Sequence, residues 1–226
     1  MFLGHFAVAL AAKRVAPRAS LGTLVAAGQA IDLLWPLLVL AGLESFRIEP
    51  GNTAMTPLAF DSYPWSHSLL MTLLLAILFG AAVARWGSGL RSGVVAGFAV
   101  VSHWMLDYVT HRPDLQLVPW LPDRVGLGLW DDPAVAIPLE GALFLAAVLS
   151  YAWGTRARDR VGGPAYVLFV ALLAGLFALN LSSPPPPSTR AVAITALALW
   201  VFVAWAAWLD RHRDPKAAGA GAGPSR

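Results

Sequence analysis

Residues 65–86 read WSHSLLMTLLLAILFGAAVARW, a stretch in which Arg85 is the only Lys, Arg, Asp or Glu. A helix of about 20 mainly apolar residues is long enough to cross the hydrocarbon core of a bilayer. Within that core every backbone polar group must be hydrogen-bonded inside the protein, and a helix achieves this within one segment. The stretch therefore predicts a membrane-spanning helix.

Comparable apolar runs lie on both sides of this stretch. They cover residues 21–43, 89–109, 134–153, 165–181 and 191–209. Residues 1–12 are also apolar, but a full crossing needs about 17–25 residues, so a short or half-inserted helix is predicted there. We do not expect a cleavable signal peptide, because Lys13 and Arg14 follow this apolar run rather than precede it.

The composition excludes an ordinary soluble domain, because 58% of residues are hydrophobic and only 13% are charged. The loops between the apolar runs are too short to hold a second folded unit. We predict an all-α, polytopic transmembrane helical bundle with six full spans and a short N-terminal helix. Residues 1–215 would form this single domain, and residues 216–226 a disordered tail.

The basic residues indicate an orientation in the membrane. They gather in alternate connections, at residues 13–18, 85–91, 156–160 and 211–216. Because basic loops remain on the cytoplasmic side, the N-terminus is expected outside and the C-terminus inside a bacterial cytoplasmic membrane. On this interpretation the excess of Lys and Arg reflects the orientation of the protein in the membrane, and no nucleic-acid partner is expected.

Six ionisable residues interrupt the apolar runs. They are His5, Asp32, His67, His103, Asp107 and Glu140. Each costs several kcal/mol in a membrane unless it is paired, hydrated or metal-bound. A single such residue is most simply explained as a buried hydrogen bond. In the predicted orientation, however, five lie in the outer half of their helices and Asp32 lies near mid-depth, which favours one shared site.

The strongest local pattern is residues 103–111, HWMLDYVTH. His103, Asp107 and His111 are spaced at i, i+4 and i+8, so one helix face carries all three. Successive members lie about 6 Å apart along the axis and the outer two about 12 Å apart. His103 and Asp107 could bind one ion as neighbouring ligands, which leaves His111 for a second metal, an anionic substrate or a hydrogen bond.

The residue types restrict the chemistry of such a site. The chain has no cysteine, so a metal would be held by His and carboxylate, a set that suits Zn²⁺ or Mn²⁺. Such an ion lowers the pKa of bound water toward ~7. Glu140 and His111 are the candidate catalytic residues; Glu140 could equally be a further ligand or the partner of a buried His. A serine hydrolase is not expected, because no Gly-x-Ser-x-Gly motif occurs.

Two further features lie outside this cluster. Arg112 and Arg124, in an outer loop rich in Pro and Trp, could bind the phosphate of a substrate, although an aromatic belt with surface charges is an alternative. Gly89, Gly93 and Gly97 recur at every fourth residue and predict a small face for close helix packing.

The order of these residues along the chain also resembles a known family. Gly4-His5, then Asp32, then Ser66-His67-Ser68, then His103-x3-Asp107 resembles the YdjM-like membrane-bound metal-dependent hydrolases over roughly the first half of the chain. The resemblance implies an integral-membrane hydrolase with a divalent metal held by His5, Asp32, His67, His103 and Asp107. The family's weaker similarity to zinc-dependent phospholipases C and P1-type nucleases points toward phosphoesters. We expect a lipid-linked or other amphiphilic ester, or a phosphoester, as substrate. The chain departs from the family pattern by lacking a second aspartate near Asp32, and by having Tyr-Pro-Trp65 before the Ser-His-Ser segment.

Three hypotheses follow for the function. The first is a metal-dependent hydrolase with its active site in the outer half of the membrane. The second is a metal-ion or proton transporter that uses the same His and Asp cluster. A transporter should carry polar groups through both halves of the membrane and often has internal repeats, and neither feature is evident here. The third is a structural protein with a vestigial or regulatory metal site.

Overall fold

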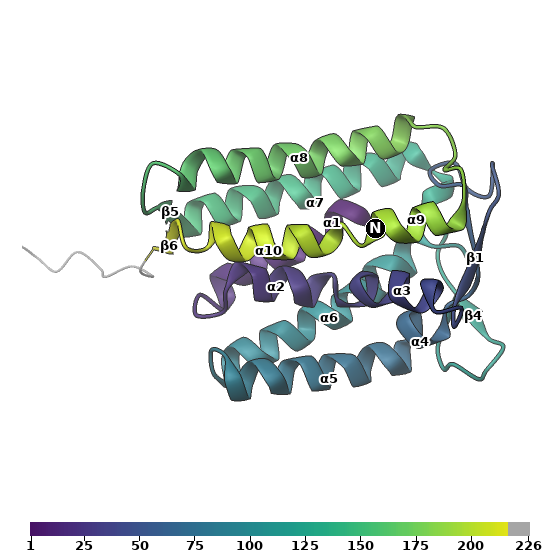
Figure 1. Cartoon of the computed structure of the whole chain (residues 1–226), viewed down its shortest axis with the longest axis horizontal. Coiled ribbons are helices and arrows are strands. Elements are labelled where there is room, and N and C mark those ends of the chain that lie inside the picture. The colour runs from purple at the N-terminus through teal and green to yellow at the C-terminus, as the bar shows by residue number, and fades with distance from the viewer. Residues whose placement is uncertain (217–226) are drawn as a thin grey trace, which may run out of the picture.

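A computed structural model describes residues 1–216, and the predicted tail lies outside the described residues except for Lys216. Long helices run side by side, as the prediction of an all-α bundle requires (Figure 1). In this part of the chain, five helical stretches are long and apolar enough to cross a membrane. They are α5 (Leu69–Trp86), α6 (Leu90–Thr110), α7 (Pro133–Gly154), α8 (Gly162–Ser182) and the run Thr189–Leu209, which comprises α9 (Thr189–Ala196) and α10 (Leu199–Leu209).

The span predicted at residues 21–43 is broken into two helices. α2 (Leu21–Gly28) and α3 (Ala30–Leu40) meet at Gln29 with a bend of 57°. Together they are as apolar as the other spans, so the pair is either a broken sixth span or a re-entrant loop. Gly28 lies just before this break, where a larger residue would not fit. A Cβ at this position would lie 2.8 Å from the backbone oxygen of His5. Pro36 has no N–H to bond to the carbonyl of Asp32, which weakens the first turn of α3 further.

The short N-terminal helix lies inside the bundle. α1 (Phe2–Val15) buries Leu3, Phe6 and Leu10, and it packs against α2, α6 and α7. Its polar residues are confined to its two ends. Near the end of α1, Lys13 Nζ lies 2.7 Å from Asp210 Oδ1, so this buried charge is paired. α1 is therefore a core helix, which explains why it need not be long enough to cross the membrane.

The two ends of the bundle differ. At one end lies a group of short elements that we call the cap, residues 44–64 and 111–132 (Figure 1). It contains the antiparallel pair β1 (Ser45–Ile48) and β2 (Leu58–Ser62), the pair β3 (Leu115–Gln116) and β4 (Arg124–Val125), and the 3-10 helix η1 (Leu129–Asp131). The short helix α4 (Pro64–His67) leads from the cap into α5. The opposite end holds the pair β5 (Thr155–Ala157) and β6 (Arg213–Pro215).

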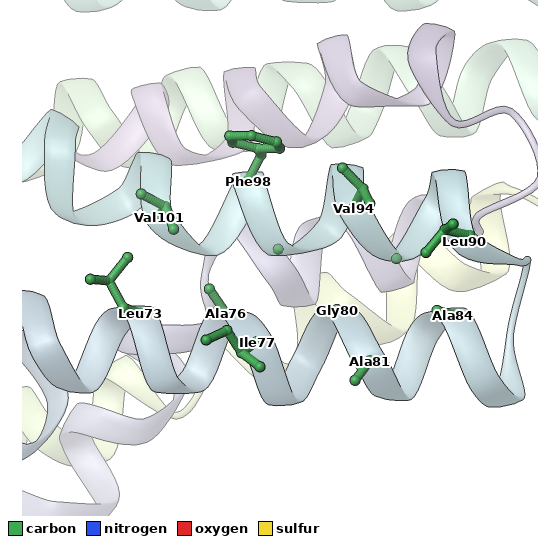
Figure 2. Close-up of a pocket in the computed structure, with 12 residues that line it drawn as sticks. Leu73, Ala76, Ile77, Gly80, Ala81, Ala84, Leu90, Val94, Phe98 and Val101 are labelled. Carbon is green, nitrogen blue, oxygen red and sulfur yellow. The ribbon is translucent and has the colours of Figure 1, made fainter.

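Helices α5 and α6 pack closely against each other through small residues. Figure 2 shows Ala76, Gly80 and Ala84 of α5 along the line where this helix meets α6. A Cβ at Gly93 would collide with the carbonyl oxygen of Gly80, and one at Gly97 would lie 3.2 Å from the carbonyl oxygen of Ala76. The predicted packing role of these two glycines is confirmed. Gly89 instead precedes α6 with φ +85°, a left-handed conformation that favours glycine for its backbone.

Substitution of Gly93 by Ala should lower the stability of the protein. The added Cβ has to separate two backbones, and overpacking of this kind costs about 1–3 kcal/mol. Gly141→Ala is the matched control, because it lies within α7 and a Cβ there meets nothing within 4 Å. Thermal unfolding in detergent micelles should give a lower midpoint for Gly93→Ala only. Equal midpoints for the two variants would contradict the close approach of α5 and α6.

Candidate metal centre

The five residues predicted as metal ligands meet at the cap end of the bundle. His5 comes from α1, Asp32 from α3, His67 from α4, and His103 and Asp107 from α6. Their ligand atoms form two groups, His5 with His103 and Asp107, and Asp32 with His67 and His103, and within each group all atoms lie within 4.8 Å of one another. Four separate elements therefore bring these side chains to one place.

The spacing of the ligand atoms fits a shared ion. His103 Nε2 lies 3.1 Å from Asp107 Oδ2 and 3.6 Å from Asp32 Oδ1. His67 Nε2 lies 3.6 Å from Asp32 Oδ1 and 3.9 Å from Asp107 Oδ2. Two ligands each ~2.1 Å from a tetrahedral ion are about 3.4 Å apart, so these pairwise separations are close to those around a Zn²⁺ or a similar ion. Asp32 and Asp107 belong to different groups of three, which share His103.

The hydrogen bonding of His103 leaves its Nε2 atom available. Its Nδ1 lies 2.8 Å from the backbone oxygen of Gly28, and a carbonyl can only accept, so the ring proton is on Nδ1. His103 is fully buried, and Nε2 has no hydrogen-bond partner among the described residues. A buried unpaired nitrogen costs free energy. With Nδ1 held by this carbonyl, Nε2 is the ring nitrogen that faces Asp107, Asp32 and His67, which is the arrangement of a metal ligand held from behind by a backbone carbonyl.

His111 is oriented in the same way by the cap. Its Nδ1 lies 3.1 Å from Asp114 Oδ1, and the Tyr63 hydroxyl donates to the same oxygen. Burial raises the pKa of the Tyr63 hydroxyl well above its usual range, and the Asp114 carboxylate raises it further, so Tyr63 remains a donor. His111 Nε2 lies 4.0 Å from Asp107 Oδ1, outside both ligand groups. This nitrogen is therefore placed beside the centre.

The other side of Asp107 faces positive or polar groups. The amino group of Met1 lies 2.6 Å from Asp107 Oδ1, and His5 Nε2 lies 3.1 Å from the same oxygen. The ring of His5 stacks on that of His103, with centroids 3.5 Å apart. Asp107 is consequently the central carboxylate of the cluster, with Oδ2 toward His67 and His103 and Oδ1 toward His5 and the amino group.

Glu140 supports the start of α1. Its Oε1 accepts hydrogen bonds from the backbone N–H groups of Leu3 and Gly4. The first N–H groups of a helix have no partner within the helix, so this carboxylate satisfies two that would otherwise be buried and unpaired. The hydrogen bonds of Glu140 therefore go to the backbone of the helix that carries His5 rather than to a buried His.

A cavity of about 180 Å³ gives access to the cluster. Its polar lining consists of Asp32, Thr56, His67, Asp107, His111, Glu140 and Asn180. Its apolar lining includes Trp35, Met55, Leu58, Phe60, Trp130 and Phe177. The cap contributes Met55, Leu58 and Trp130, so the cavity lies at the cap end. The cavity therefore suits a ligand in which a small polar group is joined to an apolar portion.

Arg112 and Arg124 lie outside this cavity lining. Arg112 Nη1 donates to the side-chain oxygen of Asn52 at 2.8 Å, and Arg124 Nη2 donates to the backbone oxygen of Asp61 at 2.8 Å. Both side chains are exposed and join separate segments of the cap. Their observed contacts are thus within the protein, and phosphate binding by either remains a prediction.

Three residues around the centre were not singled out from the sequence. Tyr63 and Asp114 orient His111, and Glu44 contacts the segment that carries His67. Each lies in a connection between helices, where polar residues are common and so attract no attention. The position of Glu44 directly after an apolar run is the only signal, and it does not distinguish a buried acid from a surface one.

Comparison of the chain with protein-family models, with curated proteins and with solved structures gave no match.

Proposed function

We propose that the chain is an integral-membrane hydrolase dependent on a divalent metal, with its active site in the outer half of the bilayer. Asp32, His67, His103 and Asp107 would hold the ion, with His5 beside Asp107. Zn²⁺ or Mn²⁺ is the expected ion because the donors are imidazole and carboxylate. The substrate would be an ester or phosphoester with an apolar portion, as the resemblance to the YdjM-like hydrolases implies.

One observation carries the proposal. In a fully buried position, the bare Nε2 of His103 faces two carboxylates and a second His at distances that suit a common ion. Nε2 makes no hydrogen bond of acceptable geometry with these neighbours among the described residues, and an ion between them would use this atom. Buried polar clusters are costly in membranes, so a cluster assembled from four elements is a candidate functional site.

The surrounding residues would supply positioning and proton transfer. When bound, the ion acts as a Lewis acid toward the ester oxygen and activates water. His111 Nε2 carries a lone pair and lies next to Asp107, so it can accept a proton and return it to a leaving group. The apolar cavity lining would bind the remainder of the substrate and exclude bulk water.

The structure of α1 favours hydrolysis over transport. Between His5 and Lys13 this helix carries only apolar residues, about 12 Å along its axis. Phe6, Ala9 and Leu10 in this interval are fully buried against neighbouring helices. A transport path from the cluster along α1 toward the opposite end would have to displace this packed core. A cavity at the cap end, with packed apolar residues along α1 behind it, fits an enzyme that acts at that face.

The proposed function is tested on the purified protein in lipid nanodiscs. Metal content is measured by mass spectrometry, and hydrolysis is measured with nitrophenyl carboxylic esters and phosphodiesters of increasing acyl length. We expect at least one bound ion per protein and hydrolysis of either the carboxylic esters or the phosphodiesters. A chelator should abolish this hydrolysis, and added Zn²⁺ or Mn²⁺ should restore it. Ion or proton flux in liposomes without hydrolysis would support the transporter instead. Absence of any metal binding would refute the proposed centre.

The orientation of the chain is a separate prediction. Since the chain has no native cysteine, Asp123→Cys in the cap and Arg158→Cys at the opposite end each introduce a single thiol. A membrane-impermeant maleimide applied to intact cells should label residue 123, and should label residue 158 only after lysis. The reverse pattern would place the cavity on the cytoplasmic side and remove the outer-leaflet site.

A further inference from the structure

We infer that Glu44 acts through the Ser66 hydroxyl to position His67 and to keep its Nε2 atom free of a proton. Glu44 is thus assigned as a positioning residue for the centre, although it does not touch the cavity. The inference rests on the proposed metal centre, and its experiment includes a measurement that does not require a metal.

Glu44 is buried beneath the short helix α4 and uses both carboxylate oxygens. Its Oε1 accepts from the backbone N–H groups of Trp65 and Ser66, each at 2.8 Å. Its Oε2 accepts from the Ser66 hydroxyl at 2.6 Å. The side chain is 3% exposed, so these bonds replace its hydration. A carboxylate that receives three donors holds the Ser66 hydroxyl in one direction.

This direction determines which ring nitrogen of His67 carries the proton. A hydroxyl has one hydrogen, and that of Ser66 is used by Glu44. The Ser66 oxygen lies 2.7 Å from His67 Nδ1 and can therefore only accept there. In the neutral ring the proton must therefore lie on Nδ1, which leaves a lone pair on Nε2, the atom directed at Asp32 and Asp107.

The backbone of His67 is also fixed. Its carbonyl oxygen accepts from the indole Nε1 of Trp104 at 2.8 Å. The chain of Glu44, Ser66 and His67 resembles in its chemistry the carboxylate and His pairs that orient metal ligands in proteins, with a hydroxyl inserted between them. We expect these hydrogen bonds to fix the orientation of the His67 ring and to make its Nε2 atom a stronger metal ligand.

We call the two hydrogen bonds that join Glu44, Ser66 and His67 the relay. Glu44→Gln tests the direction in which these hydrogen bonds run. The amide oxygen of Gln can still accept from the two backbone N–H groups, but its NH₂ group would donate to the Ser66 oxygen. The Ser66 hydroxyl would then donate to His67 Nδ1 and drive the ring proton to Nε2. Loss of an outer-sphere partner costs about 10–100-fold in metal affinity, and we expect a loss in this range for Zn²⁺.

Two substitutions of Ser66 separate the relay from general stability. Ser66→Ala removes the hydroxyl and should weaken Zn²⁺ binding by a similar factor, whereas Ser66→Thr keeps a hydroxyl and should restore affinity. Ser68→Ala is the matched control. Ser68 follows His67 and is as buried as Ser66, but its hydroxyl oxygen caps α5 by accepting from Met71 N at 3.4 Å. This control should leave the affinity unchanged.

Two measurements are made on each protein in nanodiscs, Zn²⁺ titration calorimetry and ¹⁵N NMR of the His67 ring in the metal-free state. We expect the wild type to show a proton on Nδ1, and Glu44→Gln to show it on Nε2. A wild-type ring protonated on Nε2, or unchanged tautomer and affinity in Glu44→Gln and Ser66→Ala, would overturn the inference. If the wild type bound no Zn²⁺ but its tautomer still switched in Glu44→Gln, the proposed metal centre would fail and the relay would stand.

Discussion

Asp107→Asn is expected to reduce metal affinity by more than ~100-fold, because it changes the carboxylate that faces both ligand groups. Loss of an outer-sphere residue alone costs about 10–100-fold, and a direct ligand should cost more. Asn still offers an oxygen to the Met1 amino group and to His5, which lie 2.6 and 3.1 Å from Asp107 Oδ1. The fold should therefore survive the substitution, and metal content should fall without aggregation.

Asp107→Leu separates the ligand role from a structural one. Leu cannot accept from the buried amino group, and breaking a buried ion pair in this way costs about 3–5 kcal/mol. We expect both variants to lose metal, but Leu to lower the melting temperature of the metal-free protein far more than Asn. Asp61→Asn, which removes a carboxylate paired with Arg47 in the cap, is the control for a change of charge. Wild-type metal content in Asp107→Asn would leave the proposed hydrolase without its chemistry.

His103→Gln and His111→Gln should have unequal effects although both residues lie on one face of α6. His103 belongs to both ligand groups, so its loss should reduce affinity by more than ~100-fold. His111 Nε2 lies 4.0 Å from Asp107 Oδ1 and belongs to neither group, so its loss should cost about tenfold or less. Zn²⁺ titration with melting temperature for each variant is the measurement.

The two variants also separate binding from turnover. If His111 transfers a proton, His111→Gln should lower kcat while most of the metal is retained, because such transfer contributes about 10²–10⁴-fold. Equal loss of metal from His103→Gln and His111→Gln would show that a single ion is not bound in the way proposed. Unchanged metal content in His103→Gln would contradict the ligand role of its unpaired Nε2.

The sequence by itself determined the helical bundle, because a bilayer restricts a chain of this hydropathy to helices that satisfy their own backbone. The runs that contain α5 to α8 were evident from hydropathy alone, and their observed bounds lie close to the predicted ones. The common face of His103, Asp107 and His111 was also determined locally, because the helical repeat places residues at i and i+4 together. Asp107 indeed lies 3.1 Å from His103 and 4.0 Å from His111.

Convergence of the cluster was predictable only as a shared depth. In the predicted orientation His5, His67 and His103 lie at a similar depth, but depth does not indicate which helix faces which neighbour. The 57° bend at Gln29 turns the first turn of α3, and with it Asp32, toward the centre. Beside the bend, the backbone of His5 closely approaches Gly28, a contact between segments that are distant in the chain.

Tertiary structure alone decided which atoms of the candidate ligands are available. Gly28, Ser66 and Asp114 each occupy the Nδ1 side of a His, and in each case the partner directs Nε2 toward the cluster. A backbone carbonyl has no sequence signal, and Glu44 and Asp114 lie in connections where acidic residues are common. Hydropathy fixes where a side chain lies in the membrane, whereas its tautomer and direction depend on hydrogen bonds made by long-range packing.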